Sequence, residues 1–467
     1  MGISSHDRTL GEFAARGRGP CWRRYVLALS AGLAALVCTA AARTQTPQQY
    51  VYTTTQSTPP TNNIAGFAKN GQTGALAAVP GSSFDERLDG TALAVDALGR
   101  FVFVLNPADN DISMFRIDPN TGALSEVSGS PFATGPTIDP AAAPTSPNVI
   151  AAEKSGQYLY VGYRYGSLQG NAAINEYVID AANQVLVPTQ QSGLELASSS
   201  VGMVADPKGL YLYVALGPNP QTGAQDAQIN IYAIDPQTGG LALNGAGGGS
   251  ETGRCMAMDP KGRFLFYGHG YVGGFIESAV ISPVDGVPLS NGPTIILGEG
   301  NFPSAMVVES TGKYLYVWAG SDAVWIYSIN QTISELAEVQ GSPQKVAINA
   351  TVVADPVGPY IYSEDAAGVH GYQVDAQSGL LTEIPGSPFA AGGPAAGGIA
   401  ITGTPPQAES GPATAFVPAS VSFGDWVTGA TSNTIIVRLV NTGNQTLNVT
   451  GIAILGTNSA DFSQTNT

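Results

Sequence analysis

The sequence is poor in charged residues. They make up 12% of the 467 residues, against about 25% in an average soluble domain. Helical bundles and coiled coils need charged outer faces, so this composition argues against them. In contrast, 58 glycines and 32 prolines favour many short strands joined by tight turns. We therefore expect an all-β protein, and its 43% hydrophobic content is enough for a sizeable core.

Cysteine and histidine are also scarce. Cys21 and Cys38 lie near the N-terminus and only Cys255 lies in the remainder, so a mature chain without the N-terminal segment has no internal disulfide. Only His269 and His370 occur outside that segment. The sequence has no metal-ligand cluster, glycine-rich phosphate loop or nucleophile elbow. We therefore expect neither a metal nor a cofactor.

Long hydrophobic runs are absent as well. The apolar run at residues 25–37 has 13 residues, fewer than the roughly 20 that a spanning helix needs. Arg23 and Arg24 precede it and three alanines, residues 40–42, follow it. This is the order of a secretory signal peptide, so we predict that residues 1–42 are a leader and that the protein is secreted, periplasmic or on the cell surface. An uncleaved anchor and twin-arginine export stay open.

The net charge limits the partners. Residues 1–42 carry five arginines and two acids, a net of +3, so the remainder carries −16 − 3 = −19. Such a surface repels phosphate backbones and anionic membranes, which excludes nucleic acid as an expected partner. A small molecule, a carbohydrate or a protein of the cell envelope stays open as partner.

A repeat determines the predicted architecture. An acid with glycine three residues later and aromatic residues five and seven residues later occurs six times, at intervals of 46 to 57 residues. The acids are Asp96, Glu153, Asp206, Asp259, Glu309 and Asp355. We interpret the aromatic pairs as packing between repeats, and the acids as acceptors for backbone N–H groups in a turn.

Each repeat is typical of a propeller blade. In one of them, apolar runs at 203–205, 211–214, 229–234 and from 241 alternate with tight turns, which indicates four antiparallel strands in about 50 residues. Residues 50–79 supply three strands of a seventh unit and residues 398–401 supply its first. We therefore predict a seven-bladed β-propeller over residues 50–402, closed by a C-terminal strand that removes exposed sheet edges.

The variable connections are all expected on one face, where binding residues concentrate. The position five residues before each acid should ring the mouth of the channel there. These positions are Thr91, Asn148, Val201, Arg254, Ser304, Ala350 and, by extrapolation, Gly397. Only Arg254 is charged; it could hold a carboxylate or phosphate or polarise a lactone carbonyl, or it could pair with Glu251 or Glu299. Our further ligand-binding candidates are Thr91, Asn148, Ser304, Arg164 and His269.

Several sequence segments resemble those of bacterial lactonase-type, 6-phosphogluconolactonase-like seven-bladed propellers. They are residues 101–106, 112–115 and 118–124, together with Gly-Ser-Pro-Phe at 129–132 and again at 386–389. The resemblance covers residues 50–402 and implies a lactone hydrolase. Arg254 matches the arginine that the family places at the channel, and Asn148 stands where the family has histidine.

Hydrolysis would also need a base. Glu299, Glu364 and Asp365 are candidates by their loop positions, and Glu299 is our candidate for a catalytic role beside Arg254. His269 and His370 are expected in solvated loops.

Residues 403–415 are rich in proline and glycine, as in a linker. Beyond them, phrases at 421–424, 439–443 and 461–463 resemble an immunoglobulin-like choice-of-anchor D (ASH-like) module. Residues 416–467 number 52, about half of such a sandwich, so we expect a partial module.

Two functions follow from these patterns. The first is an exported lactonase-like propeller that binds a small ligand, with a sugar lactone and its hydrolysis as the specific form. The alternative is a non-catalytic cell-envelope or extracellular propeller that binds carbohydrate or protein through its variable loops. A purely structural propeller of surface-layer type shares the same features, because this fold hosts many functions.

Overall fold

The computed structural model describes part of the chain. The described residues are 2–3, 8–15, 23–28, 48–56, 62–85, 90–134, 147–163, 172–189, 193–196, 198–217, 228–247, 253–270, 273–290, 292–320, 323–346, 351–403, 414–417, 420–426, 431–432, 435–441, 447–449, 454 and 461–465. The chain divides into two compact units, Thr46–Pro405 and Met1–Gln45 with Pro406–Thr467. Among the described residues, no helix is long and apolar enough to cross a membrane.

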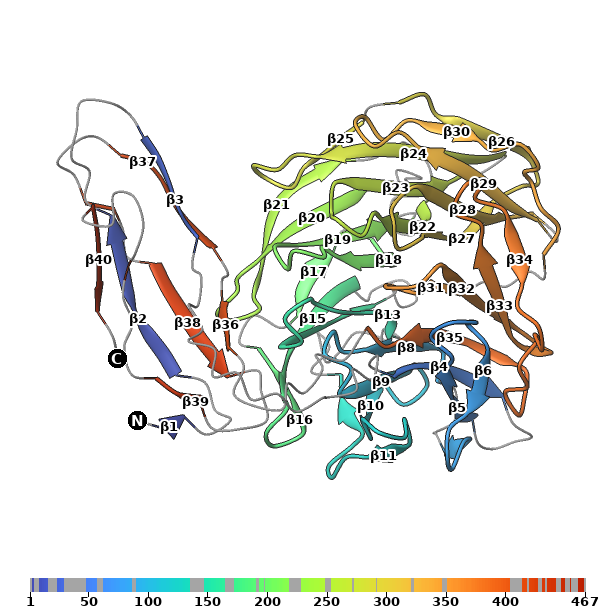
Figure 1. Ribbon diagram of the computed structural model, residues 1–467, viewed down its shortest axis with the longest axis horizontal. Coiled ribbons are helices and arrows are strands. Elements are labelled where there is room, and N and C mark those ends of the chain that lie inside the picture. The colour runs from blue at the N-terminus through green and yellow to red at the C-terminus, as the bar shows by residue number, and fades with distance from the viewer. Residues whose placement is uncertain are drawn as a thin grey trace, which may run out of the picture. The chain divides into compact units, whose positions relative to one another are not determined.

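The larger unit is a seven-bladed β-propeller, as the repeat predicts (Figure 1). The innermost strands of blades 1 to 7 are β8 (Ala92–Val95), β13 (Pro147–Ala152), β18 (Ser200–Ala205), β22 (Gly253–Met258), β27 (Pro303–Val308), β31 (Val352–Ala354) and β35 (Ala395–Ile401). The second strands are β9 (Phe101–Asn106), β14 (Tyr158–Tyr163), β19 (Tyr211–Leu216), β23 (Phe264–His269), β28 (Tyr314–Ala319), β32 (Tyr360–Asp365) and β4 (Gln49–Gln56). All neighbours pair antiparallel, and the fourth strands lie at the periphery of Figure 1.

The outer half of each blade holds two further strands. The third strands are β10 (Asp111–Ile117), β15 (Ala172–Asp180), β20 (Ile229–Ile234), β24 (Gly273–Ile281), β29 (Val324–Ile329), β33 (Gly368–Val374) and β5 (Asn62–Lys69). The fourth strands are β11 (Leu124–Glu126), β16 (Val185–Pro188), β21 (Leu241–Gly247), β25 (Pro288–Ser290), β30 (Leu336–Glu338), β34 (Leu381–Glu383) and β6 (Leu76–Ala78).

Four blades also have a short fifth strand that returns to the third strand, which the sequence did not predict. These strands are β7 (Phe84–Asp85), β12 (Phe132–Ala133), β17 (Leu194–Leu196) and β26 (Ile295–Glu299). The recurring Gly-Ser-Pro phrase explains the return in blade 1, because the Ser130 hydroxyl accepts the Met114 N–H at 3.0 Å. Ser342 and Ser387 accept an N–H of their third strands in the same way, at 3.0 and 3.1 Å.

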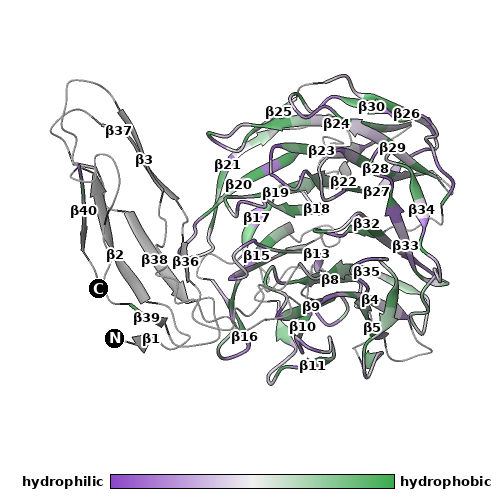
Figure 2. Cartoon of the chain, in the orientation of Figure 1, coloured by the Kyte–Doolittle hydropathy of each residue, from purple (hydrophilic) through white to green (hydrophobic). Residues whose placement is uncertain are grey.

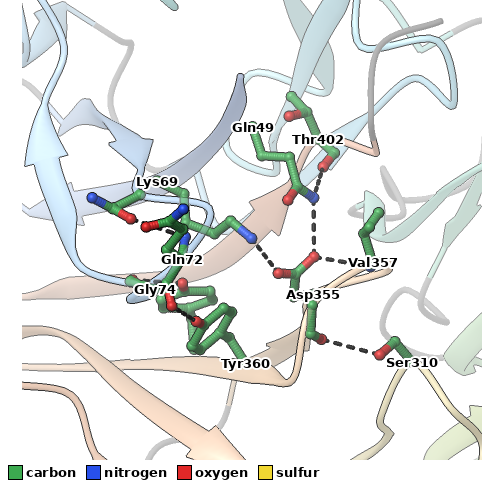
Figure 3. Close-up of polar contacts among 12 residues, drawn as sticks. Gln49, Lys69, Gln72, Gly74, Ser310, Asp355, Val357, Tyr360 and Thr402 are labelled. Atoms are coloured by element: carbon green, nitrogen blue, oxygen red, sulfur yellow. Dashed lines mark hydrogen bonds and ion pairs between the residues drawn. The ribbon is translucent and has the colours of Figure 1, made fainter. Parts of the chain in front are cut away.

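The predicted closure is confirmed. In blade 7, β35 pairs with β4, and the register joins Ile399 to Thr53, Ala400 to Tyr52 and Ile401 to Val51. The two ends of the propeller therefore share one sheet. Next to the Ile401–Val51 pair, Gln49 donates to both Asp355 and Thr402 (Figure 3), so the closing blade is also tied to blade 6.

The core lies between neighbouring blades. One buried cluster joins Phe103 and Leu105 of blade 1 to Leu159 and Val161 of blade 2. The aromatic pairs therefore pack between blades, as predicted. Figure 2 shows the hydrophobic residues along the strands and hydrophilic residues at the peripheral turns.

The smaller unit combines both ends of the chain. Its four-stranded sheet has the order β36 (Thr414–Val417), β38 (Ile435–Asn441), β2 (Arg8–Ala15) and β40 (Phe462–Thr465). Two further pairs are β3 (Arg23–Ala28) with β37 (Ser420–Trp426), and β1 (Gly2–Ile3) with β39 (Leu447–Asn448). Segments of the expected leader thus pair with C-terminal strands. The signal peptide and the immunoglobulin-like module stay predictions.

Candidate functional site at the mouth of the strand ring

The seven innermost strands form a closed ring. Each contacts the next in the order β35, β8, β13, β18, β22, β27 and β31, and β31 contacts β35 again. We call the end of this ring at which the innermost strands begin the mouth. The second strands run antiparallel to the innermost ones, so they end at the mouth. Residues near either position can reach a ligand bound there.

The sequence-predicted rim positions coincide with breaks in strand register. The pairing of the innermost with the second strand shifts between Pro147 and Val149, Ser200 and Gly202, Gly253 and Cys255, Pro303 and Ala305, and Ala395 and Ile399. The residues inside these shifts include Asn148, Val201, Arg254, Ser304 and Gly397. Bulges re-aim a residue out of the ladder and are common beside active sites. Five of the seven innermost strands are therefore irregular where a ligand site was expected.

The polar rim residues differ in exposure and in the hydrogen bonds that they already make within the protein. Asn148 donates to the Ser200 carbonyl at 2.6 Å and accepts from the Ser200 hydroxyl at 3.2 Å, so it bridges blades 2 and 3. Ser304 is exposed and donates to the Trp318 carbonyl at 3.2 Å. Thr91 is exposed at the start of blade 1. Three predicted positions lie outside the description: Arg164 and Ala350 as whole residues, and Arg254 beyond its backbone.

Glu364 is the charged residue that the described structure places beneath the rim. It lies near the end of β32, one residue beyond the pair Ser363–Val352, and is 2% exposed. Neither carboxyl oxygen has a hydrogen bond of ordinary geometry among the described residues. Burial raises the pKa of Glu364 to about 8, although the Gly397 N–H and the Thr351 hydroxyl face the carboxyl and lower the pKa in part. Gly397 is itself an exposed rim residue, so the carboxyl lies directly under the mouth between blades 6 and 7.

A second buried carboxyl provides a contrast. Burial raises the pKa of Glu176 to about 7, but its two oxygens accept the Thr189 hydroxyl at 2.9 Å and the Leu241 N–H at 3.1 Å. Glu176 therefore has a structural task between blades 2 and 3. A perturbed carboxyl without such partners is the kind that functional sites hold.

The expectation that both histidines lie in solvated loops is wrong. His269 ends β23, is 5% exposed, and its Nε2 lies 3.0 Å from Glu277 Oε1. The hydrogen bond from His269 lowers the pKa of Glu277, and the ring of His269 stacks on Phe275 at 5.4 Å. His370 lies in β33 and is 7% exposed. Both imidazoles are held inside their blades because the strand ladders continue through them.

The other two candidate bases do not share the buried environment of Glu364. Glu299 is exposed at the end of β26, where it pairs with Gly273 of the third strand of blade 4 rather than with an innermost strand. Asp365 follows Glu364, but its Oδ2 lies 3.1 Å from His370 Nε2. The structure therefore distinguishes Glu364 among the three carboxylates that the sequence proposed by loop position.

The repeat contains a signal that identifies Glu364 from sequence. It stands nine residues after the acid of its repeat, whereas the same slot in the other five repeats with an acid holds uncharged residues. These are Leu105, Gly162, Ala215, Gly268 and Trp318. An alignment of the repeats at this slot would have distinguished it from Glu299. No comparable signal marks Glu277, which the sequence analysis missed.

The fold is that of a seven-bladed β-propeller whose strand register is irregular at the end of the ring where the innermost strands begin. A family model described as "Lactonase, 7-bladed beta-propeller" matches residues 24–139, about a quarter of the chain. No curated protein matches the chain by sequence.

Solved structures share the fold over most of the chain. One is described as a "putative 6-phosphogluconolactonase" from Bacteroides fragilis, with a TM-score of 0.61 and 18% identity over 77% of this chain and 99% of that one. Another is the periplasmic gluconolactonase PpgL of Pseudomonas aeruginosa, with a TM-score of 0.56 and 15% identity over 77% of this chain and 100% of that one. At these identities the likeness concerns the fold.

Proposed function

We propose that the propeller binds a sugar lactone at the mouth of its strand ring and hydrolyses it with Glu364 as the base. The observation that carries this proposal is the buried Glu364 carboxyl, which lies beside the exposed rim residue Gly397 and lacks ordinary hydrogen-bond partners. The bulged rim and the likeness to lactonase propellers support the same placement.

Lactone hydrolysis needs an activated water and a group that stabilises the oxyanion. In the proposed reaction, the Glu364 carboxylate takes a proton from a water molecule while the water oxygen bonds to the lactone carbonyl carbon. The ring C–O bond then breaks, and the leaving oxygen takes the proton, which gives a hydroxy acid. Arg254, at the bulge of β22, would stabilise the negative charge on the carbonyl oxygen.

The pKa of Glu364 sets the expected pH dependence. The base must be ionised, and burial raises the pKa of this carboxyl to about 8. The catalysed rate should therefore rise with pH and level off above about 8, after subtraction of the spontaneous hydrolysis.

The direct test is hydrolysis of gluconolactone by the purified full chain. We expect a rate above the spontaneous one, a loss of about 100-fold in Glu364→Gln and a loss of about 10- to 100-fold in Arg254→Ala. Glu338→Gln, on the exposed end of β30, is the matched control and should retain the wild-type rate. A wild-type rate equal to buffer, or equal rates for wild type and Glu364→Gln, would contradict the proposal.

The non-catalytic alternative predicts a different result in the same experiment. It requires binding of a carbohydrate or a protein through the variable loops, measured by calorimetry, without any acceleration of gluconolactone hydrolysis. We further propose an exported location, which the order of charged, apolar and small residues in positions 1–42 supports. A carbohydrate or an envelope protein is then the proposed partner of the variable loops.

A further inference from the structure

A concave site lies between the outer parts of blades 5 and 6. It is a cavity of about 370 Å³, within the range of about 300–1,000 Å³ typical of small-molecule sites. Residues 344–346, which follow β30, form one wall, and strands β33 and β34 form the other. The lining contains both charged and apolar side chains, so it can orient a ligand as well as bury it.

His370 anchors one wall of this cavity. Its Nδ1 lies 3.1 Å from Glu383 Oε1 and its Nε2 lies 3.1 Å from Asp365 Oδ2. The ring is nearly parallel to that of Tyr372, with 6.3 Å between centroids. Ser387 donates a second hydrogen bond to Glu383 Oε1, at 2.8 Å. These contacts use one oxygen of Glu383 and hold its carboxylate at the cavity, where 49% of the side chain is exposed.

The opposite wall carries the exposed cation Lys345. Lys345 is exposed and makes no ion pair with any described residue. The neighbouring Gln344 is already committed, because its amide accepts the Leu381 N–H at 2.7 Å and donates to the Leu381 carbonyl at 3.3 Å. One cavity therefore presents an ammonium and a carboxylate that are not paired with each other, with Val346 and the buried Leu381 beside them.

We propose that this cavity binds a small zwitterion of the α-amino acid class. The ligand carboxylate would pair with Lys345, its ammonium with Glu383, and its side chain would pack against Val346 and Leu381. A multiply charged anion fits poorly because Glu383 and Asp365 would repel it, and a neutral ligand would leave both charges unused. The inference is independent of the proposed lactone site.

The test is calorimetric titration of the full chain at pH 7 with the twenty common α-amino acids, starting with leucine because of the aliphatic wall. Two analogues of each binder are the matched ligands: the N-acetyl derivative, which lacks the ammonium, and the amide, which lacks the carboxylate. We expect at least one amino acid to bind, and each analogue to bind at least tenfold more weakly. No binding at millimolar concentration, or equal binding of both analogues, would overturn the proposal.

Variants then locate the site. Lys345→Met should weaken binding of the amino acid at least tenfold and should not restore binding of the amide, which lacks the carboxylate. Glu383→Gln should likewise weaken binding of the amino acid and should not restore binding of the N-acetyl derivative, which lacks the ammonium. Lys313→Met, an exposed lysine of blade 5, should bind as wild type does. Binding that survives both site variants would overturn the location. The gluconolactone assay of these variants should be unchanged whatever the outcome.

Discussion

Five tyrosines join a blade to the next by the same hydrogen bond. Each hydroxyl donates, at 2.7–2.9 Å, to a glycine carbonyl in the turn between the third and fourth strands of the following blade. The pairs are Tyr52–Gly122, Tyr160–Gly239, Tyr213–Gly286, Tyr316–Gly379 and Tyr362–Gly74. A second tyrosine, two residues earlier, packs on the same glycine and leaves no room for a Cβ.

Blades 1 and 4 use a different contact. They carry Phe103 and Phe266 in place of the tyrosine, and the turns that follow hold Gln184 and Ser334 rather than glycine at positive φ. An arginine precedes each phenylalanine pair and lies over its first ring, with 5.5 Å for Arg100 and 4.6 Å for Arg263. Glycine in these turns therefore depends on which aromatic residue the previous blade presents.

This dependence gives a stability prediction. Gly286 has a φ of 72°, and a Cβ built there would lie 2.6 Å from the Tyr211 ring. Gly286→Ala should lower the free energy of unfolding by about 2 kcal/mol, from the left-handed backbone and the overlap together. Ser334→Gly is the matched control, since it removes a side chain from a left-handed position, and it should cause no loss. Thermal unfolding compares the two, and an unchanged midpoint for Gly286→Ala would refute the packing argument.

Glu364 gives a second prediction, on the pH dependence of stability. Its pKa is raised in the folded protein, so between about 4.5 and 8 the unfolded chain is ionised while the folded chain stays protonated. This carboxyl therefore costs stability increasingly as pH rises through that window, and the full cost is reached above about 8. At pH 8.5, the free energy of unfolding of Glu364→Gln should exceed that of wild type by about 2 kcal/mol. At pH 4 this difference should vanish. A gain that is independent of pH would show that the carboxyl is not neutral in the fold.

At the scale of strands, the sequence predicts what local chemistry determines. The turn Asp206-Pro-Lys-Gly209 and the aromatic residues two apart in each second strand follow from backbone preferences and the period of a strand. Those features predict the four-stranded blade and, by their count, the closure of β35 onto β4.

The bulges, the fifth strands and the burial of Glu364 depend on contacts between distant segments. Glu364 is enclosed by Thr351 and Gly397, and a loop position cannot indicate that enclosure. The histidines show the same limit. Gly268 and Gly270 around His269 suggest a loop, but the pairings of His269 with Gly253 and Phe275 extend the ladder through it.

For the whole molecule, the decisive step is the closure of the ring by its two ends. Tyr50 and Thr402 exchange hydrogen bonds of 2.9 Å, one through the Thr402 hydroxyl. Lys69 of blade 7 donates to Asp355 of blade 6, and the two side chains are 3% and 0% exposed (Figure 3). In blades 1 and 4 the equivalent acid pairs with an arginine of its own turn that is about one-third exposed. The pair at the closure is thus buried and joins two blades.

The closure pair gives the last prediction. Burial alone would raise the pKa of Asp355, but hydrogen bonds from Lys69, the Val357 N–H and Gln49 lower it below its usual value. Lys69→Met removes the cation and leaves a buried carboxylate, so the free energy of unfolding should fall by about 3 kcal/mol at pH 7. A carboxyl with a lowered pKa contributes stability above its unfolded pKa and loses it as pH falls, so the difference from wild type should shrink towards pH 3.

The double variant Lys69→Met/Asp355→Asn should recover part of the loss at pH 7, because the amide oxygen still accepts from Val357 and Gln49. Lys313→Met controls for loss of an exposed lysine. If chemical unfolding finds Lys69→Met and Lys313→Met equally stable at pH 7, the buried pair does not hold the ring closed.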